Sequence, residues 1–488
     1  MSVLDPEIKR STPDRMALRL LLIACLLVTT AHVVLGADPV VLCLAMLTVA
    51  AGVGAAMHLG YLNLAALLIL LVVFRYIGFP LIGKLLFLQP LDSNMGQPLG
   101  SIASILLGVS AYLFALMLVA KMEIKRAVLV PTMDHRQLSR ISVVAMAIGC
   151  AANIGMALHA GREYTGVTVA NFFMPFLHLA LISAIAAELC KSGRQRAWNF
   201  WVLSIVLVEI VFTMVRNSRM SVAEVMLCYI VTLLAFRGKV RWLRIGLTGV
   251  LALLLVVAIT PVMLYVRGVR SDLTWTQRIE ATLEAAADWP TAFAHFKAAE
   301  WLQERHGFYL NYYGSPQNIL ERISLVNHVD VMKCATDRHG PVGIKDLHIA
   351  FIRSLPRIVA PDKPVGSSHG SWINCQANIE CVEGSYATVP LIANGYAAIG
   401  WAGAMIYPFL LGSVLLLLIR VVSGFDLNYN VWAIYLLIRF QNSFVEGDSA
   451  TYFLSIIRDI PQDVVLMIAI AWIAGAGRLR FRKHMGAT

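Results

Sequence analysis

The sequence predicts an all-α polytopic membrane protein, with about 12 transmembrane helices and one large, mostly helical periplasmic loop between the ninth and tenth. Two observations predict this class. First, 58% of the 488 residues are hydrophobic and only 14% are charged, whereas soluble domains are about one-half apolar and about one-quarter charged. Second, apolar runs recur along the chain except over residues 267–399, and loops of that length usually carry structure or function.

Twelve apolar runs are predicted to span the membrane. Each is close to the roughly 20 residues of helix that cross about 30 Å of hydrocarbon. The eleventh and twelfth are interrupted by Arg439, Arg458 and Asp459. The predicted spans are 16–35, 39–58, 62–82, 102–120, 141–159, 171–190, 200–215, 220–236, 245–266, 400–419, 430–446 and 462–477.

Lysine and arginine in the short loops predict the orientation of these spans, because such residues concentrate on the cytoplasmic side. Basic residues gather in the tail 1–15, in 121–140, in "KSGRQR" at 191–196, in "RGKVRWLR" at 237–244 and in the tail 478–488. We therefore expect both termini in the cytoplasm and residues 267–399 in the periplasm. The net charge of +11 is scattered among these loops, so it indicates anchoring rather than binding of nucleic acid.

Four arginines run against this charge pattern on the predicted outer side. Arg216 and Arg219 flank the turn "RNSR" between the seventh and eighth spans, and Arg267 and Arg270 follow the ninth. Two interpretations remain open. Arginine snorkels at either membrane interface, and it also binds phosphate in a bidentate manner. The second interpretation predicts a phosphate-bearing ligand at the outer surface.

The long loop has two parts. Residues 274–307 predict one or two helices broken at Pro290, because apolar residues recur there at helical spacing. Residues 321–386 alternate bases, acids, histidines and prolines beside aromatic residues. Such a composition suits sugar rings and also suits a folded lid.

Cysteines in this loop allow two structures. Cys375 and Cys381 are close enough in sequence for a disulfide in an oxidising periplasm, which leaves Cys334 free. A zinc site that includes His369 is the weaker alternative, because no paired C-x-x-C spacing is present. We therefore predict no metal and no cofactor.

Two arginines lie inside predicted spans, Arg75 in the third and Arg439 in the eleventh. Charges within the membrane are functional candidates, and Arg439 is one of the predicted substrate-binding residues. A structural ion pair, such as Arg439 with Glu446, is the alternative.

Four short motifs carry a resemblance to a known family. They are "RNSRMS" at 216–221, "ERIS" at 321–324, "LPRIVAPDKP" at 355–364 and "YAAIGWAG" at 396–403. With the twelve spans and the late periplasmic loop, the chain from about 200 to 420 resembles the Wzy-type O-antigen and exopolysaccharide repeat-unit polymerases. This superfamily includes the O-antigen ligases and is related to type C glycosyltransferases. The chain departs from the family at Asn394, where a glutamate is expected.

The resemblance implies a metal-independent glycosyl transfer. The donor is an undecaprenyl-diphosphate-linked oligosaccharide and the acceptor is a second lipid-linked glycan. Fixed arginines can stabilise the leaving diphosphate, so Arg322, Arg357 and Lys363 of the loop join the outer arginines as candidate ligands. A flippase and a chain-length regulator of the same pathway are the implied partners.

The general base that such a transfer needs has two candidates. His328 has an ordinary pKa near 6.5, suited to proton removal near neutral pH, and on a helix it would share a face with Glu321. Asp362 is the carboxylate rival, although Lys363 beside it favours a structural pair. His369, Glu383 and Glu446 are the next residues to examine.

Three other functions stay open on the sequence. A ligase that moves glycan to lipid A or protein shares the donor chemistry. A flippase or secondary transporter fits twelve spans, but it explains neither the long loop nor the lack of an inverted repeat. A membrane scaffold leaves the outer arginines without a role.

Overall fold

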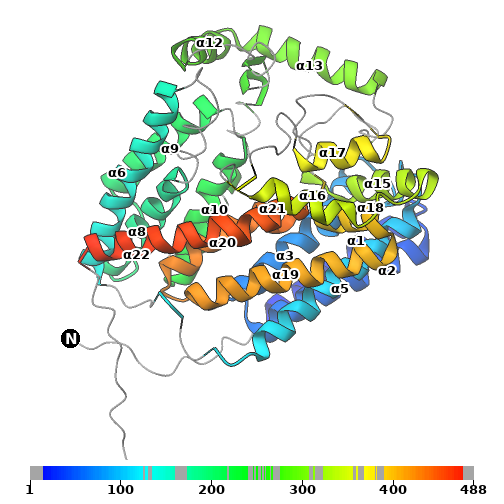
Figure 1. Cartoon of the computed structure of the whole chain (residues 1–488), viewed down its shortest axis with the longest axis horizontal. Coiled ribbons are helices and arrows are strands. Elements are labelled where there is room, and N and C mark those ends of the chain that lie inside the picture. The colour runs from blue at the N-terminus through cyan, green and yellow to red at the C-terminus, as the bar shows by residue number, and fades with distance from the viewer. Residues whose placement is uncertain are drawn as a thin grey trace, which may run out of the picture. The chain divides into compact units, whose positions relative to one another are not determined.

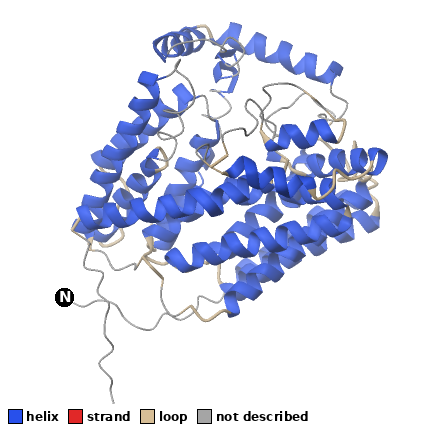
Figure 2. Cartoon of the chain, in the orientation of Figure 1, coloured by secondary structure: helices blue, strands red, loops and turns tan. Residues whose placement is uncertain are grey.

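Every element in the described part of this computed structural model is helical (Figures 1 and 2). The prediction of an all-α fold is therefore confirmed for that part of the chain. The described residues are 15–124, 127–129, 134–159, 173–216, 219–239, 275–306, 312–313, 323–355, 359–360, 368–379, 381 and 389–475, with some between 246 and 266.

Five of the described helices are long and apolar enough to cross a membrane. They are Pro39–Leu59, Leu64–Leu86, Pro98–Lys121, His135–Gly155 and Trp401–Ser423. Shorter apolar helices cover Ile23–Val34, Phe200–Thr213 and Val222–Ala235. The chain is therefore an all-α membrane protein, while the full set of twelve spans stays a prediction.

Most predicted spans coincide with a helix in the structure. The corresponding helices are α1 (Arg15–Val34), α2 (Pro39–Leu59), α3 (Leu64–Val73), α5 (Pro98–Lys121), α6 (His135–His159), α8 (Phe176–Lys191), α9 (Phe200–Arg216), α10 (Arg219–Ala235), α19 (Trp401–Ser423), α20 (Val431–Glu446) and α22 (Ile460–Ile473). Several are shorter than the roughly 20 residues that a perpendicular crossing needs.

The third predicted span contains a π-helical turn. Helix α3 continues into η1 (Phe74–Gly78) and then into α4 (Phe79–Leu86). Pro80 has no N–H to donate and its ring crowds the carbonyl four residues earlier, so the α-helical ladder cannot run unbroken here. Such turns are frequent at functional sites, and this one carries Arg75.

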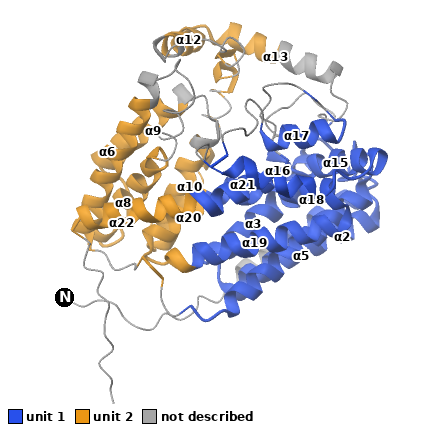
Figure 3. Ribbon diagram, viewed as in Figure 1, with its two compact units in different colours: residues 1–125, 300–420, 440–458 blue, residues 126–299, 421–439, 459–488 orange. Residues whose placement is uncertain are grey.

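The chain divides into two compact units (Figure 3). Unit 1 contains residues 1–125, 300–420 and 440–458, and unit 2 contains 126–299, 421–439 and 459–488. In unit 1 the second half of the predicted loop packs on apolar helices. It forms α15 (Val326–His339), α16 (Lys345–Ser354), α17 (His369–Gln376) and α18 (Leu391–Ile399), which contact α5, α21 (Ser449–Leu454) and one another.

The two glycines of "YAAIGWAG", Gly400 and Gly403, have different structural roles, one in the backbone conformation and one in a close approach of helices. Gly400 ends α18 at a φ of +67°, a conformation that favours glycine. A Cβ on Gly395 would lie 2.2 Å from the carbonyl oxygen of Gly403. Substitution of Gly395 or Gly403 would therefore force α18 and α19 apart.

The first half of the predicted loop belongs to unit 2 as far as residue 299. Helix α12 (Trp275–Ala287) ends just before α13 (Trp289–His306), with Pro290 in the first turn of α13. The predicted break at Pro290 is confirmed. In the same unit Phe176 stacks on Tyr435 with ring centroids 5.5 Å apart.

Candidate functional site

Arg75 connects three segments of unit 1. Its guanidinium forms an ion pair with Glu446 at the end of α20, and its Nε donates to the carbonyl oxygen of Ile323 over 2.9 Å. The backbone N–H of Leu325 donates in turn to the Arg75 carbonyl over 3.0 Å. The side chains of Arg75 and Glu446 are 11% and 29% exposed. A charge within an apolar helix is thus neutralised while its carboxylate partner keeps contact with the surroundings.

This arrangement places Arg75 beside Ile323, in the described part of "ERIS". The side chain of Arg75 contacts Ile323, and its backbone carbonyl contacts Leu325. Arg322 lies outside the described residues. The sequence predicts Arg75 as a charge inside a span, but it does not predict the contact with Ile323.

A second polar cluster in unit 1 centres on the buried carboxylate of Asp346. One oxygen accepts from His369 Nε2 over 2.8 Å. The other accepts from Asn394 Nδ2 over 3.1 Å and from Ser449 Oγ over 3.3 Å. Asn394 Oδ1 also accepts from the backbone N–H of Ser449 over 2.8 Å. Asn394 therefore presents its amide to a carboxylate supplied by α16.

The geometry of this cluster differs from that of a serine-nucleophile triad. Such a triad uses both ring nitrogens of histidine, one for serine and one for the carboxylate. Here Ser449 Oγ and Asp346 both approach the same nitrogen, Nε2, at 3.1 and 2.8 Å. Nδ1 of His369 is buried and has no hydrogen-bond partner in the described part of the chain. The cluster joins α16, α17, α18 and α21 rather than activating the serine.

A third group of contacts joins α15 to the start of α5. Asp330 accepts from the backbone N–H groups of Gly96 and Gln97 over 2.7 and 2.9 Å, and from Ser101 Oγ over 2.7 Å. Gly96 and Gln97 directly precede α5, which begins at Pro98. Asp330 therefore attaches α15 to the segment that leads into α5, and it satisfies backbone donors that would otherwise lack a partner.

Lys333 and Asp337 extend this connection to α18. Lys333 Nζ donates to Asp337 and to Gln97 Oε1, and Tyr396 OH donates to Asp337 over 2.8 Å. Burial raises the pKa of Asp337, but the hydrogen bonds from Lys333 and Tyr396 outweigh it and lower the pKa overall. Burial lowers the pKa of Lys333, and Asp337 and Tyr396 raise it overall. The pair is therefore ionised together.

Arg439 lies in unit 2 and pairs with two carboxylates, those of Asp459 at 3.4 Å and Asp463 at 3.3 Å. The predicted alternative of a pair between Arg439 and Glu446 is corrected by these partners, since Glu446 pairs with Arg75. Asp459 and Asp463 lie one helical turn apart, so their carboxylates meet the guanidinium from one face. This arrangement favours a structural role for Arg439.

His328, a candidate base, lies in α15, and its Nδ1 is 3.0 Å from Asn327 Oδ1. Helix α15 begins at Val326, after Glu321, so the shared helical face expected for His328 and Glu321 is wrong for this helix. His328 and Arg439 belong to different units.

The other predicted site residues have no described side chain. Arg216 ends α9 and Arg219 begins α10. The remaining candidates, Asp362, Arg267, Arg270, Arg322, Arg357 and Lys363, lie outside the described residues.

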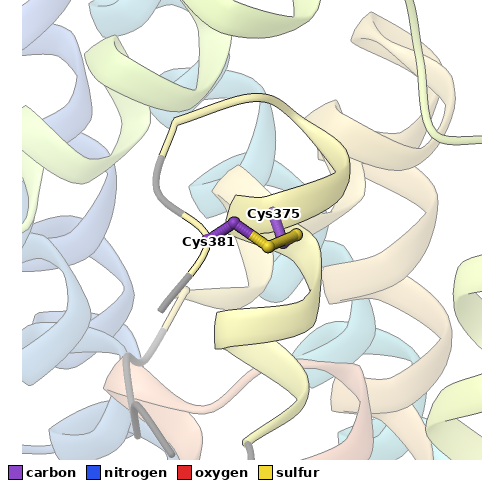
Figure 4. The surroundings of a disulfide bond; sticks show 2 residues. All are labelled: Cys375 and Cys381. Carbon is purple, nitrogen blue, oxygen red and sulfur yellow. A yellow bond between two sulfur atoms is a disulfide. The ribbon is translucent and has the colours of Figure 1, made fainter. Parts of the chain in front are cut away.

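The disulfide that the sequence allows is present (Figure 4). Cys375 and Cys381 are bonded with a Cα–Cα distance of 4.4 Å, and Cys334 is free. The bond occupies the two thiols that the zinc alternative requires. Within the described ranges no three His, Cys, Asp or Glu side chains are placed to hold a metal ion.

Comparison with known proteins identifies no relative. No protein-family profile matches the chain, and neither a curated protein nor a solved structure matches it.

Proposed function

We propose that this chain is a glycosyltransferase that polymerises polyprenyl-diphosphate-linked oligosaccharide repeat units at the periplasmic face of a bacterial inner membrane. The observation that supports this most directly is the contact of Arg75 with Glu446 and Ile323. It joins an intramembrane arginine, a partly exposed carboxylate and the "ERIS" segment, where the sequence resembles the polymerases.

The proposed reaction needs a cation and a proton acceptor. A hydroxyl oxygen of the acceptor glycan attacks the anomeric carbon of the donor, and the bond from that carbon to the diphosphate oxygen breaks. The hydroxyl proton passes to a base, and the polyprenyl diphosphate leaves with the bonding electron pair. Fixed guanidinium groups stabilise that leaving charge where water is largely excluded.

Glu446 is the base that we favour among the described residues near Arg75. Its side chain is 29% exposed, while that of His369 is 1% exposed and turns Nε2 toward Asp346. A base must reach the proton directly or through one water, and a buried histidine with a satisfied nitrogen is poorly placed for that. His328 and Asp362 remain candidates for the same role.

The test is glycan transfer by the purified full-length chain on lipid-linked repeat units in liposomes. The wild type should lengthen the glycan beyond one unit. Glu446→Gln should lower the transfer rate by about 10²–10⁴-fold, the usual contribution of a general base, and should still bind donor. Glu284→Gln, an exposed change on α12, is the matched control and should transfer normally.

The outcomes separate the function from the residue. If the wild type never joins two units, the polymerase proposal fails. If it transfers a single glycan to lipid A or a protein, the ligase alternative replaces it. If it moves donor across the bilayer without transfer, the flippase alternative does. Full transfer by Glu446→Gln would instead leave the function standing and exclude Glu446 as the base.

A further inference from the structure

A basic pocket of about 620 Å³ lies within unit 2, where the start of α6, the end of α8, the start of α9 and the end of α22 meet. Its cations are Arg136 and Arg140 of α6 and Lys191 of α8, and His135 of α6 lines it beside them. The predicted topology places these helix ends at the cytoplasmic surface, away from the proposed site of glycan transfer.

The positive charge of this pocket exceeds its negative charge, because Arg136, Arg140 and Lys191 line it with one acid, Glu188. Arg136, Arg140 and Lys191 form no ion pair within the described ranges, and all three are exposed. The acid in the lining, Glu188, accepts from Asn199 Nδ2 over 2.8 Å. The pocket therefore offers several cations to an anionic group.

One wall of the pocket is apolar and faces outward. Val143 and Ile473 both line it, and they are 51% and 59% exposed. From Val143 the apolar helix α6 continues into its membrane-spanning part. A ligand that fills the pocket can therefore place a charged group on the arginines and an apolar chain along α6.

Tryptophans lie at the pocket end of these helices, and tryptophan is enriched at membrane interfaces. Trp201 lines the pocket and donates to Ser142 Oγ over 2.9 Å. Trp198 and Trp472, next to lining residues in sequence, are 44% and 73% exposed. The pocket thus lies at the depth of lipid headgroups.

We propose that this pocket binds an anionic glycerophospholipid of the cytoplasmic leaflet. The arginines and lysine contact its phosphate, and its acyl chain lies against Val143 and Ile473. Basic pockets between transmembrane helices on this side are suited to anionic headgroups. A free phosphate would satisfy the cations but would leave the apolar wall without a partner, so charge and shape together favour a lipid.

The experiment measures lipid retention by the purified full-length protein. Native mass spectrometry counts the phosphatidylglycerol and phosphatidylcholine that stay bound after dilution from mixed nanodiscs. The wild type should retain phosphatidylglycerol in preference. Arg136→Gln with Arg140→Gln should weaken that retention by about fivefold for each charge removed. Arg196 is an exposed cation in the loop after α8, outside the pocket. Arg196→Gln should therefore retain phosphatidylglycerol as the wild type does.

Three results would overturn the proposal. Equal retention of the two lipids by the wild type removes the anionic preference. Unchanged phosphatidylglycerol retention in the double variant removes the pocket. Displacement of the lipid by millimolar inorganic phosphate would indicate a soluble phosphate ligand. Arg140→Lys keeps the charge and should retain phosphatidylglycerol as the wild type does. If the double variant unfolds at a lower temperature, this charge-preserving variant distinguishes loss of lipid binding from loss of folding.

Discussion

Arg75 and Glu446 form an ion pair although 371 positions separate them in the sequence. Arg75 lies on a π-helical turn of an apolar helix, and Glu446 ends α20. Neither charge is fully exposed, so each depends on the other for its compensation. The pair also holds the carbonyl of Ile323, so its loss affects both folding and the proposed site.

We predict that Glu446→Gln destabilises the protein by about 1.5–3 kcal/mol, the range for hydrogen bonds to charged groups. Arg75→Met with Glu446→Gln should cost less than the sum of the single changes, because neither charge is then left without a partner. Denaturant unfolding in detergent of the two single variants and the double variant measures this. Additive losses would show that the pair is not coupled.

Asp330 should matter for the attachment of α15 to α5. Asp330→Ala removes the acceptor for the N–H groups of Gly96 and Gln97, and leaving such donors without a partner costs about 1–3 kcal/mol. Hydrogen exchange at Gly96 and Gln97 should rise more than exchange at the C-terminal end of α5. An equal rise at both ends would contradict a local contact.

The membrane helices could be predicted from the sequence because a crossing helix needs only a long apolar run, which is a local property. The disulfide could be predicted for the same reason, since Cys375 and Cys381 are close in the chain. The cluster at Asp346 could not, because Ser449 lies 103 positions away and no periodicity connects them. The start of α15 at Val326 and the partners of Arg439 likewise depend on tertiary packing.

The salt bridge between Lys333 and Asp337 predicts a pH dependence of stability. The pKa of Asp337 is lowered from 3.8 in the folded state, so its contribution is present above 3.8 and is lost as the pH falls through the folded value. The pKa of Lys333 is raised from 10.5, so its contribution is present below 10.5 and is lost as the pH rises through the folded value.

Asp337→Asn should therefore flatten the acid limb of the unfolding midpoint plotted against pH, and Glu284→Gln should leave that limb unchanged. Asp337 is partly exposed, which limits the effect. A variant whose acid limb matches the wild type would show that the contacts of the Asp337 carboxylate with Lys333 and Tyr396 do not stabilise the protein in solution.

The disulfide offers a test of topology. A bond between Cys375 and Cys381 forms in the periplasm and is rare in the cytoplasm. We predict that maleimide labels these two cysteines in fresh membranes only after reduction, while mass spectrometry reports each site. Cys375→Ser should destabilise the protein by about 2 kcal/mol, as expected for a short closed loop. Labelling of both thiols without reductant would place this segment in the cytoplasm and remove the basis for an outer site.

The outer arginines give the last prediction. If Arg219 and Arg267 hold the donor diphosphate, Arg219→Lys should impair transfer although it keeps the charge, because lysine lacks the bidentate fork of arginine. Arg219→Ala and Arg267→Ala should lower donor affinity more strongly, each by about 1.5–3 kcal/mol. Binding of lipid-linked repeat units to the purified variants measures this, with Arg196→Gln on the predicted cytoplasmic side as the control. If both alanine variants bind donor and transfer glycan like the wild type at equal expression, these arginines anchor the helices at the interface. Another cationic group must then hold the diphosphate.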